Sequence, residues 1–423
     1  MVGALAIVLA TLTPSSQQIT PHSLCLICGE LGGVDVVLNV LLYMPLGAGL
    51  AMAGVRSRRG VVALGVCSAI IELLQWTIIP GRDGSVGDVV TNTLGALIGF
   101  AVGAHVHALL RPRLREGRIL VVSWLSFWVA LQATAAYAMQ PSPTRRPYYG
   151  QLARALGDEQ GYPGRILSAT LDHAPIPDRD MRESRAIHDA LARTEGAELD
   201  VTMDLPRAPT RRPSVVRIAD DGEQEILALT AEDRDLVFDV RTRASDLRLR
   251  GPIFRMDTIL PRDRDRATSA VAPTFRVQAR YALPTITLLA TRDGKMVQHD
   301  FSPSPGDAWR LIALSYKSYD ETAEERAAAA VWLMLLLLPA GYWLIAPVRS
   351  VGGSDRHTLR APLASIGIAL TLGLAVVPML FHMSVATWWE LAGAVGGVIL
   401  GAVLATLASR TRAWQLIRSD VMV

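Results

Sequence analysis

Three apolar runs between Val34 and Gly103 are each long enough to cross a bilayer, yet each carries a pair of polar residues. A membrane-spanning helix needs about 20 mostly apolar residues, so this stretch constrains the chain to a helical membrane bundle. The partners of each pair are three or four positions apart and therefore share one helix face. The pairs are Asp35 and Asn39, Glu72 and Gln75, and Asp88 and Asn92. Because a carboxylate in hydrocarbon must face the bundle interior, a partner or water, the three pairs predict a functional site.

Further apolar runs continue along the 423 residues, and half of all residues are hydrophobic. This composition indicates an integral membrane protein with a soluble portion. The runs are Val2–Leu12, Val34–Val55, Val61–Ile79, Val89–Leu109, Ile119–Met139, Ala327–Ile345, Leu363–Phe381 and Trp388–Leu407. The first run is short and lacks the basic segment of a signal peptide, so we interpret it as a first helix. The sequence therefore predicts about eight spans.

Arginine clusters follow the second, fourth, sixth and eighth runs, and such clusters favour the cytoplasmic side of a membrane. An eight-span topology places all four clusters and both termini on that side. A seven-span topology without Val2–Leu12 keeps the clusters inside and moves only the N-terminus outside. In both topologies the C-terminus is cytoplasmic and the long insert between the fifth and sixth runs is exported. Lysine occurs only at Lys295 and Lys317, and this bias toward arginine suggests a GC-rich bacterial genome, so we expect a bacterial cytoplasmic membrane.

The insert from Gln140 to Thr322 is polar and contains short runs of alternating hydrophobicity. Runs of this length, separated by turn residues, are typical of an antiparallel β-sandwich. The Asp293-Gly294 pair predicts a tight hairpin turn between the last two runs. The predicted strands are Glu198–Leu205, Ser214–Ile218, Glu225–Thr230, Asp235–Arg241, Thr274–Tyr281, Thr285–Thr291 and Lys295–His299.

The order of these strands is similar to that of the concanavalin A-like and laminin-G-like jelly roll. The segments SVVRIADDGEQEILALTAEDRDLVFDVRTR and FRVQARYALPTITLLATRDGKMV carry the resemblance, which covers roughly residues 196–309. The resemblance implies a jelly-roll-like sandwich of a kind that often binds carbohydrate. A structural or protein-binding sandwich is the alternative, because a fold does not establish a function.

The sequence therefore predicts a multi-domain membrane protein made of three units. Residues 1–139 form a five-span domain, residues 140–325 an exported all-β sandwich, and residues 326–423 three further spans with a short cytoplasmic tail. The segment SYDETAEERAAAAVW predicts a helix that runs into the sixth span, with Ser318 or Asp320 as its N-cap. Such a helix couples the sandwich stiffly to the membrane.

In this topology the three polar pairs all lie in the outer leaflet. Glu72 lies about 12 Å below the outer surface at 1.5 Å per residue, and Arg82 lies in the outer loop above it. Asp88 and Asn92 share a helix stripe with three glycines at four-residue spacing, which favours close helix packing. These glycines are Gly95, Gly99 and Gly103. We therefore expect the polar groups to converge on one interior face.

The pattern D(x3)N(x5)PxG, then E(xx)Q, R and D(x3)N(xx)G(x3)G, resembles the VanZ-like domain. Tyr43 stands where a phenylalanine is usual. The resemblance implies a bacterial envelope protein associated with low-level resistance to the glycopeptide teicoplanin, and it implies no established reaction. The matching residues are Asp35, Asn39, Pro45, Gly47, Glu72, Gln75, Arg82, Asp88, Asn92, Gly95 and Gly99.

Glu72, Arg82 and Asp88 are the candidate catalytic residues. Arg82 is suited to clamping a phosphate or carboxylate, and a buried Glu72 to acid or base chemistry. Asp35, Asn39, Gln75 and Asn92 are candidate ligand-binding residues. The alternative is an internal polar network without a ligand. No histidine or second acidic motif accompanies the three carboxylates, so we predict no metal site. The sequence does not identify a cofactor.

We expect a protein that binds a cell-wall, lipid-linked or glycopeptide ligand, with membrane lipid and cell-wall glycan as partners. The alternatives are a membrane hydrolase or transferase acting on a lipid-linked headgroup, and a sensor or assembly scaffold. The net charge of +3 is too small to indicate nucleic-acid binding. Cys25 and Cys28 form a lone CxxC, for which we expect a local disulfide in an oxidising compartment; two free thiols are the alternative.

Overall fold

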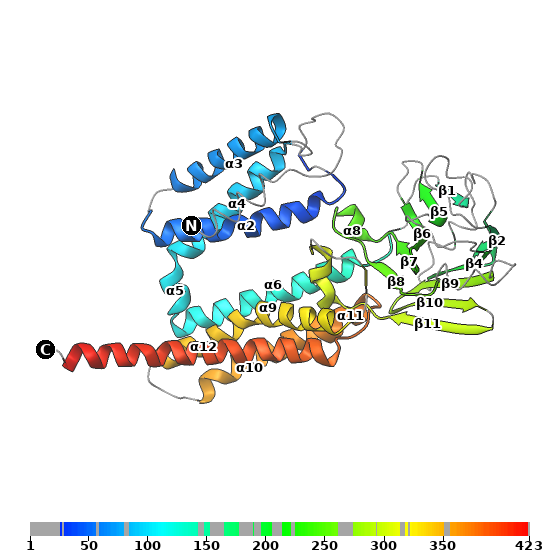
Figure 1. Ribbon diagram of the computed structural model, residues 1–423. Coiled ribbons are helices and arrows are strands. Elements are labelled where there is room, and N and C mark those ends of the chain that lie inside the picture. Colours follow the sequence, from blue (N-terminus) through cyan, green and yellow to red (C-terminus); the bar gives the residue numbers. More distant parts are fainter. Residues whose placement is uncertain are drawn as a thin grey trace.

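The computed structural model describes residues 26–27, 29–55, 59–79, 84–142, 148–152, 165–176, 189, 196–204, 214–220, 225–260, 274–292, 294–313, 318–319, 322–350 and 356–421. A helical part and a β-sandwich lie end to end (Figure 1). This arrangement confirms the predicted class, a helical membrane region with a separate antiparallel sandwich.

Seven helical segments among the described residues are long and apolar enough to cross a membrane. The predicted run Val2–Leu12 lies outside the described residues, whereas the other seven predicted runs each correspond to one segment. These are α2 (Gly32–Met52), α3 (Arg59–Thr77), α4 (Val86–Ala104), α6 (Leu114–Ala138), α9 (Ala323–Ser350), the segment made of α10 (Arg356–Thr371), η4 (Leu372–Val376) and α11 (Val377–Leu380), and α12 (Trp388–Val421).

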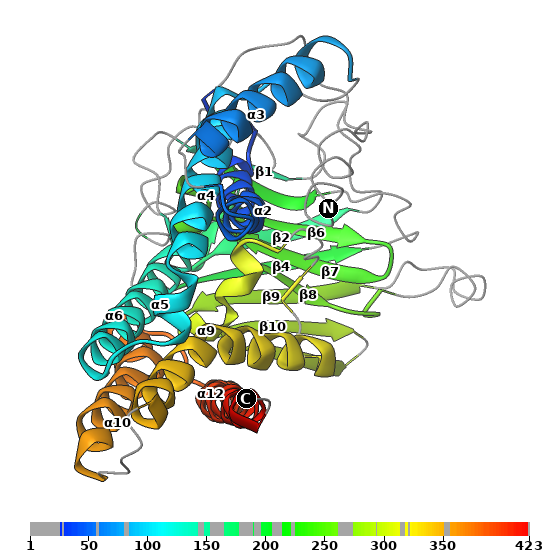
Figure 2. The same ribbon diagram turned by 90° about the vertical axis from the view of Figure 1, so that its left-hand side faces the viewer.

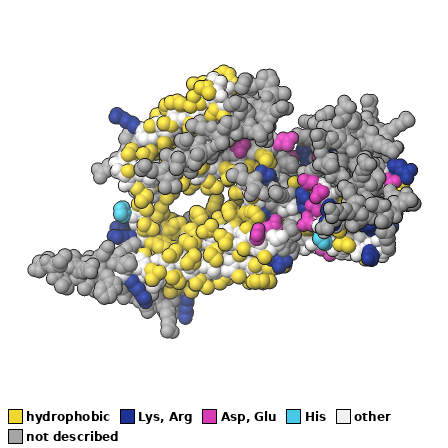
Figure 3. Space-filling model, viewed as in Figure 1, with side chains coloured by type: hydrophobic (Ala, Val, Ile, Leu, Met, Phe, Trp, Pro, Cys, Tyr) yellow, Lys and Arg dark blue, Asp and Glu magenta, His cyan; other side chains and the backbone are white. Residues whose placement is uncertain are grey.

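The helices form two groups, joined by the short helix α5 (Val106–Leu110). In the turned view, α2, α3 and α4 make one group, and α6, α9, α10 and α12 make the other (Figure 2). Tyr43, Val61 and Ala96 are buried in the first group. Trp128 of α6 is buried in the second, where its ring lies against Gly373. Hydrophobic side chains cover the helices, and charged side chains gather over the sandwich and at the ends of the helices (Figure 3).

The predicted N-cap of α9 was wrong. The helix begins at Ala323, and the Thr322 hydroxyl accepts a hydrogen bond from the Glu325 amide at 3.3 Å. Ser318 lies four positions before that cap, and Asp320 lies outside the described residues. A threonine followed three positions later by a glutamate is a capping pattern, and Thr322 and Glu325 fit it.

Two antiparallel sheets make the sandwich, in the strand orders β1-β5-β6-β7-β8 and β11-β10-β9-β4-β2-β3. All seven predicted strands are present. They are β4 (Ala197–Asp204), β5 (Ser214–Asp220), β6 (Glu225–Glu232), β7 (Asp235–Val240), β9 (Thr274–Ala282), β10 (Thr285–Arg292) and β11 (Lys295–Phe301). Four further strands were not predicted: β1 (Tyr148–Leu152), β2 (Ile166–Leu171), β3 (Ala174–Pro175) and β8 (Ile253–Met256).

Strand alternation explains both the core and the predicted hairpin. In β4 the inward residues Leu199 and Val201 are fully buried, whereas Asp200 between them is partly exposed. Arg292 of β10 pairs with Lys295 of β11, which confirms the predicted two-residue turn. Gly294 in this turn has a φ of 73°, a left-handed conformation that favours glycine.

The sandwich docks directly on several helix ends. The short helix α8 (Arg243–Asp246) and the residues after it contact α2, because the Arg248 carbonyl accepts hydrogen bonds from the Gly33 and Val34 amides at 3.0 and 3.3 Å. The buried Tyr281 hydroxyl donates to the Met139 carbonyl at the end of α6, at 3.1 Å. Backbone contacts of this kind set the position of the sandwich on the bundle.

Candidate functional site

α2 and α4 pack closely against each other along a stripe of glycines. A Cβ placed on Gly95, Gly99 or Gly103 of α4 would overlap a backbone carbonyl oxygen of α2. The overlapped oxygens belong to Val40, Met44 and Ala48. Only glycine permits so close an approach of two helix backbones. The stripe that carries Asp88 and Asn92 is therefore held against α2.

Glu72 of α3 is a nearly buried carboxylate, with 8% of its surface exposed. Its Oε2 atom accepts a hydrogen bond from the Ser85 amide at 2.9 Å. Ser85 is also the N-cap of α4, since its hydroxyl accepts a hydrogen bond from the Asp88 amide at 3.1 Å. One residue thus ties the carboxylate of α3 to the start of α4.

A second set of polar contacts joins all three helices one turn deeper. The Asn92 amide nitrogen of α4 donates to the Ser68 hydroxyl of α3 at 2.9 Å, and the Tyr43 hydroxyl of α2 shares a hydrogen bond with Ser68. Asn92 and Tyr43 are 3% and 2% exposed. The buried Oδ1 atom of Asn92 has no hydrogen-bond partner among the described residues. We call Tyr43, Ser68, Glu72 and Asn92 the three-helix cluster.

The predicted site residues take different positions around this cluster. Gln75 is buried, and Asp88 is half-buried within electrostatic range of Tyr43. Asn39 is half-buried, and Asp35 is exposed in the first turn of α2. Arg82, Cys25 and Cys28 lie outside the described residues.

Sequence reasoning missed three hydroxyl-bearing residues, although each of them follows a visible pattern. Tyr43 lies four positions after Asn39, and Ser68 lies four positions before Glu72, so each continues the stripe of a predicted pair. Ser85 precedes Asp88 by three positions, which is an N-cap pattern. Single hydroxyl groups are common in apolar helices, so the sequence does not set them apart.

The cluster offers acceptors and donors within an apolar surrounding. The Glu72 carboxylate and the Asn92 oxygen accept hydrogen bonds, and the Ser68 and Tyr43 hydroxyls donate or accept. Within the described ranges, no group of three His, Cys, Asp or Glu residues is arranged to hold a metal ion. The arrangement is suited to holding a polar group by hydrogen bonds or to moving a proton at Glu72.

A separate buried network joins the sandwich to α9 and α12 and was not predicted. Its centre is Asp307, which accepts hydrogen bonds from the Tyr319 hydroxyl at 2.7 Å and from Arg310 at 3.1 Å. Arg310 is 5% exposed and also pairs with Glu325 of α9 at 3.1 Å. Glu390 of α12 accepts a hydrogen bond from the Ser304 hydroxyl. Burial and the Asp307 charge raise the pKa of the Tyr319 phenol well above its ordinary value.

Comparisons with known proteins identify the part of the chain that contains the three-helix cluster. The model of the VanZ/LLP1 family matches residues 4–107, about a quarter of the chain. Neither the comparison with curated proteins nor the comparison with solved structures gave a match. The matched range contains α2, α3 and α4 with every residue of the three-helix cluster. Residues 4–107 are therefore similar to the VanZ/LLP1 family, and this match and the seven described apolar helices together indicate a multi-pass membrane protein.

Proposed function

We propose that this protein binds a lipid-linked or glycopeptide ligand of the bacterial cell wall at the three-helix cluster. The observation that carries the proposal is the Asn92 Oδ1 atom, which is buried and has no hydrogen-bond partner among the described residues. A buried polar atom without a partner costs about 1–3 kcal/mol. A ligand that places a hydrogen-bond donor beside Asn92 and Glu72 recovers that free energy, and the new hydrogen bonds hold the ligand in place.

The proposed site opens toward the outside of the cell. The support comes from the arginine clusters in the sequence. They lie at the end of the helices remote from the sandwich, and such clusters favour the cytoplasmic side. Asp35 and the Glu72 contact with Ser85 lie toward the opposite end, where the sandwich docks. On this proposal the sandwich is exported, the C-terminus is cytoplasmic, and membrane lipid surrounds the helices.

The second candidate function is a sensor or scaffold, and the docking of the sandwich favours it. The Arg248 carbonyl binds the first turn of α2, so a partner or glycan that moves the sandwich acts directly on the VanZ-type helices. In this alternative the three-helix cluster serves as an internal network, and the ligand is recognised by the sandwich alone.

The deciding experiment measures binding of teicoplanin and of a lipid-linked wall precursor to the full chain in nanodiscs. Glu72→Gln and Asn92→Leu are each expected to weaken binding about tenfold or more, because each removes a hydrogen-bond acceptor. Gln132→Leu is the matched control, since Gln132 is a fully buried amide in α6, outside the cluster.

The outcomes separate the candidates. Equal binding by the wild type, Glu72→Gln and Asn92→Leu contradicts a ligand site at the cluster and leaves the scaffold. If the wild type turns over the precursor, and Glu72→Gln abolishes this turnover while binding persists, the protein is a hydrolase or transferase with Glu72 as its acid or base.

A further inference from the structure

We infer that a polar cavity between the sandwich and the start of α2 is a second binding site, for a ligand that combines a phosphate with several hydroxyl groups. The cavity has a volume of about 1120 Å³. Pockets of about 300–1,000 Å³ hold whole small molecules, so the space is sufficient for a sugar phosphate. None of the residues of the three-helix cluster lines it.

Strand register builds the floor of the cavity. Arg217 of β5 pairs with Ala228 of β6, and Ala228 pairs with Asp239 of β7. Residues paired across neighbouring strands lie on the same face of a sheet. Arg217 and Asp239 therefore flank the small Ala228 side chain on one face, and both line the cavity.

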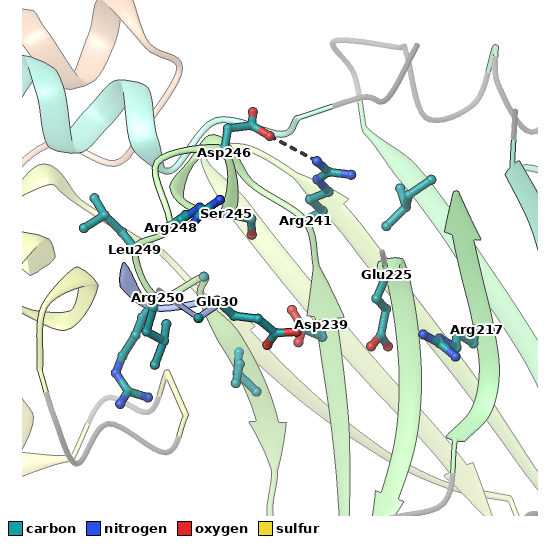
Figure 4. A pocket seen from close by; sticks show the side chains of 15 residues that line it. Glu30, Arg217, Glu225, Asp239, Arg241, Ser245, Asp246, Arg248, Leu249 and Arg250 are labelled. Carbon is teal, nitrogen blue, oxygen red and sulfur yellow. Dashed lines mark hydrogen bonds and ion pairs between the residues drawn. The ribbon is translucent and has the colours of Figure 1, made fainter. Parts of the chain in front are cut away.

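The walls come from parts of the chain that are distant in sequence. On one side, Gly29, Glu30 and Leu31 lead into α2. On the other side are Ser245 and Asp246, the last two residues of α8, and then Arg248 to Gly251. Figure 4 shows the Glu30 side chain reaching toward Asp239, and the Arg217 guanidinium beside Glu225. The cavity therefore exists only because the sandwich is docked on α2.

The charges of the lining residues select the ligand class. Four arginines line the cavity together with four carboxylates: Arg217, Arg241, Arg248, Arg250, Glu30, Glu225, Asp239 and Asp246. Guanidinium groups bind phosphate oxygens, and carboxylates accept hydrogen bonds from hydroxyl groups. A ligand that carries only negative charge would face four carboxylates as well as four arginines. A ligand that carries a phosphate and hydroxyls uses both sets.

Two arginines are held in place by contacts that use only part of their donor capacity. A guanidinium has five N–H donors. Arg241 contacts Asp220 and Asp246 at 3.0 and 3.1 Å with two different nitrogens, and Arg248 donates to the Ile27 carbonyl. Pre-positioned side chains of this kind lose little conformational entropy when a ligand binds.

Other ligand classes fit the described lining less well. No aromatic residue is among the lining residues, so the cavity offers no ring for stacking a base or an unsubstituted sugar face. The described residues contain no group of three His, Cys, Asp or Glu residues arranged for a metal ion. The dense charge also disfavours an apolar ligand.

The test uses the full chain in phosphatidylcholine nanodiscs and calorimetric titration with glucose 1-phosphate. Saturable binding is expected, with glucose and inorganic phosphate each binding at least about tenfold more weakly. Arg217→Gln and Asp239→Asn are each expected to weaken binding of glucose 1-phosphate about tenfold or more. The matched controls are Arg276→Gln and Asp200→Asn, an ion pair at 2.5 Å on the other sheet, which are expected to leave binding unchanged.

Three results would overturn the inference: no saturable binding, equal binding of inorganic phosphate alone, or equal weakening by the control substitutions. If Arg217→Gln or Asp239→Asn prevents folding, Glu30→Gln in the exposed segment before α2 replaces it and is expected to weaken binding likewise. Glu72→Gln is expected to bind glucose 1-phosphate normally. This result keeps the cavity and the three-helix cluster independently testable.

Discussion

The carbonyl oxygen of Arg248, in the sandwich, accepts a hydrogen bond from the backbone amide of Gly33, in the first turn of α2, at 3.0 Å. The first amides of a helix have no partner within the helix. The sandwich therefore supplies an acceptor that α2 lacks, and this bond links a VanZ-type helix to the sandwich. A Cβ on Gly33 would overlap the Leu247 carbonyl oxygen, so only glycine permits the contact.

Gly33→Ala is expected to separate the sandwich from α2. The added methyl group removes the Arg248 hydrogen bond and leaves the folded helices otherwise unchanged. The measurement is the distance distribution between spin labels on α3 and β10, which should broaden. Gly49→Ala is the control, because a Cβ at Gly49 meets no atom within 4 Å. An unchanged distribution in Gly33→Ala would show that other contacts alone hold the sandwich.

Gly99→Ala is expected to destabilise the packing of α2 against α4. The new methyl group would overlap the Met44 carbonyl oxygen, and overpacking of this kind typically costs about 1–3 kcal/mol. The measurement is the unfolding free energy in mixed detergent micelles, titrated with a denaturing detergent. Gly367→Ala in α10 meets no atom within 4 Å and should be neutral. Equal stability of the two variants would refute the close contact.

Asp307→Asn is expected to destabilise the junction of the sandwich with α9 by about 3–5 kcal/mol. The substitution leaves the 5%-exposed Arg310 with fewer negative partners, and breaking a buried ion pair carries a cost of this size. Asp200→Asn removes an exposed pair with Arg276 and should cost less than about 1 kcal/mol. Thermal unfolding of both variants measures the difference, and similar losses would contradict the role of burial.

High pH is expected to destabilise the sandwich through Tyr319. Burial and the charge of Asp307 raise the pKa of this phenol in the folded protein above its value in the unfolded chain. The stabilisation is therefore complete below the unfolded pKa of about 10 and is lost as the pH rises beyond it. Tyr319→Phe should flatten this part of the stability profile, measured by chemical unfolding between pH 8 and pH 11 in steps of about 0.5. An unchanged slope would assign the loss to other groups, such as the buried Tyr281.

Much of the architecture follows from local patterns. Apolar runs of sufficient length specify the membrane helices, and strict alternation specifies strands such as β4 and β9. The strands that escaped prediction are short or weakly patterned, as β3 shows with its two residues. The cap of α9 was misplaced because several residues before Ala323 have side chains able to accept from a helix amide.

The amino-acid sequence by itself determined the membrane helices, the predicted strands and the polar pairs, because hydrophobic periodicity depends only on neighbouring residues. Tertiary structure alone decided which polar groups meet. Ser68 and Asn92 are 24 positions apart, and Tyr281 and Met139 are 142 positions apart. Arg248 can cap α2, and the charged cavity can form beside it, only when the sandwich packs against α2. Contacts between distant segments follow from packing, and a local pattern does not specify which residues pair.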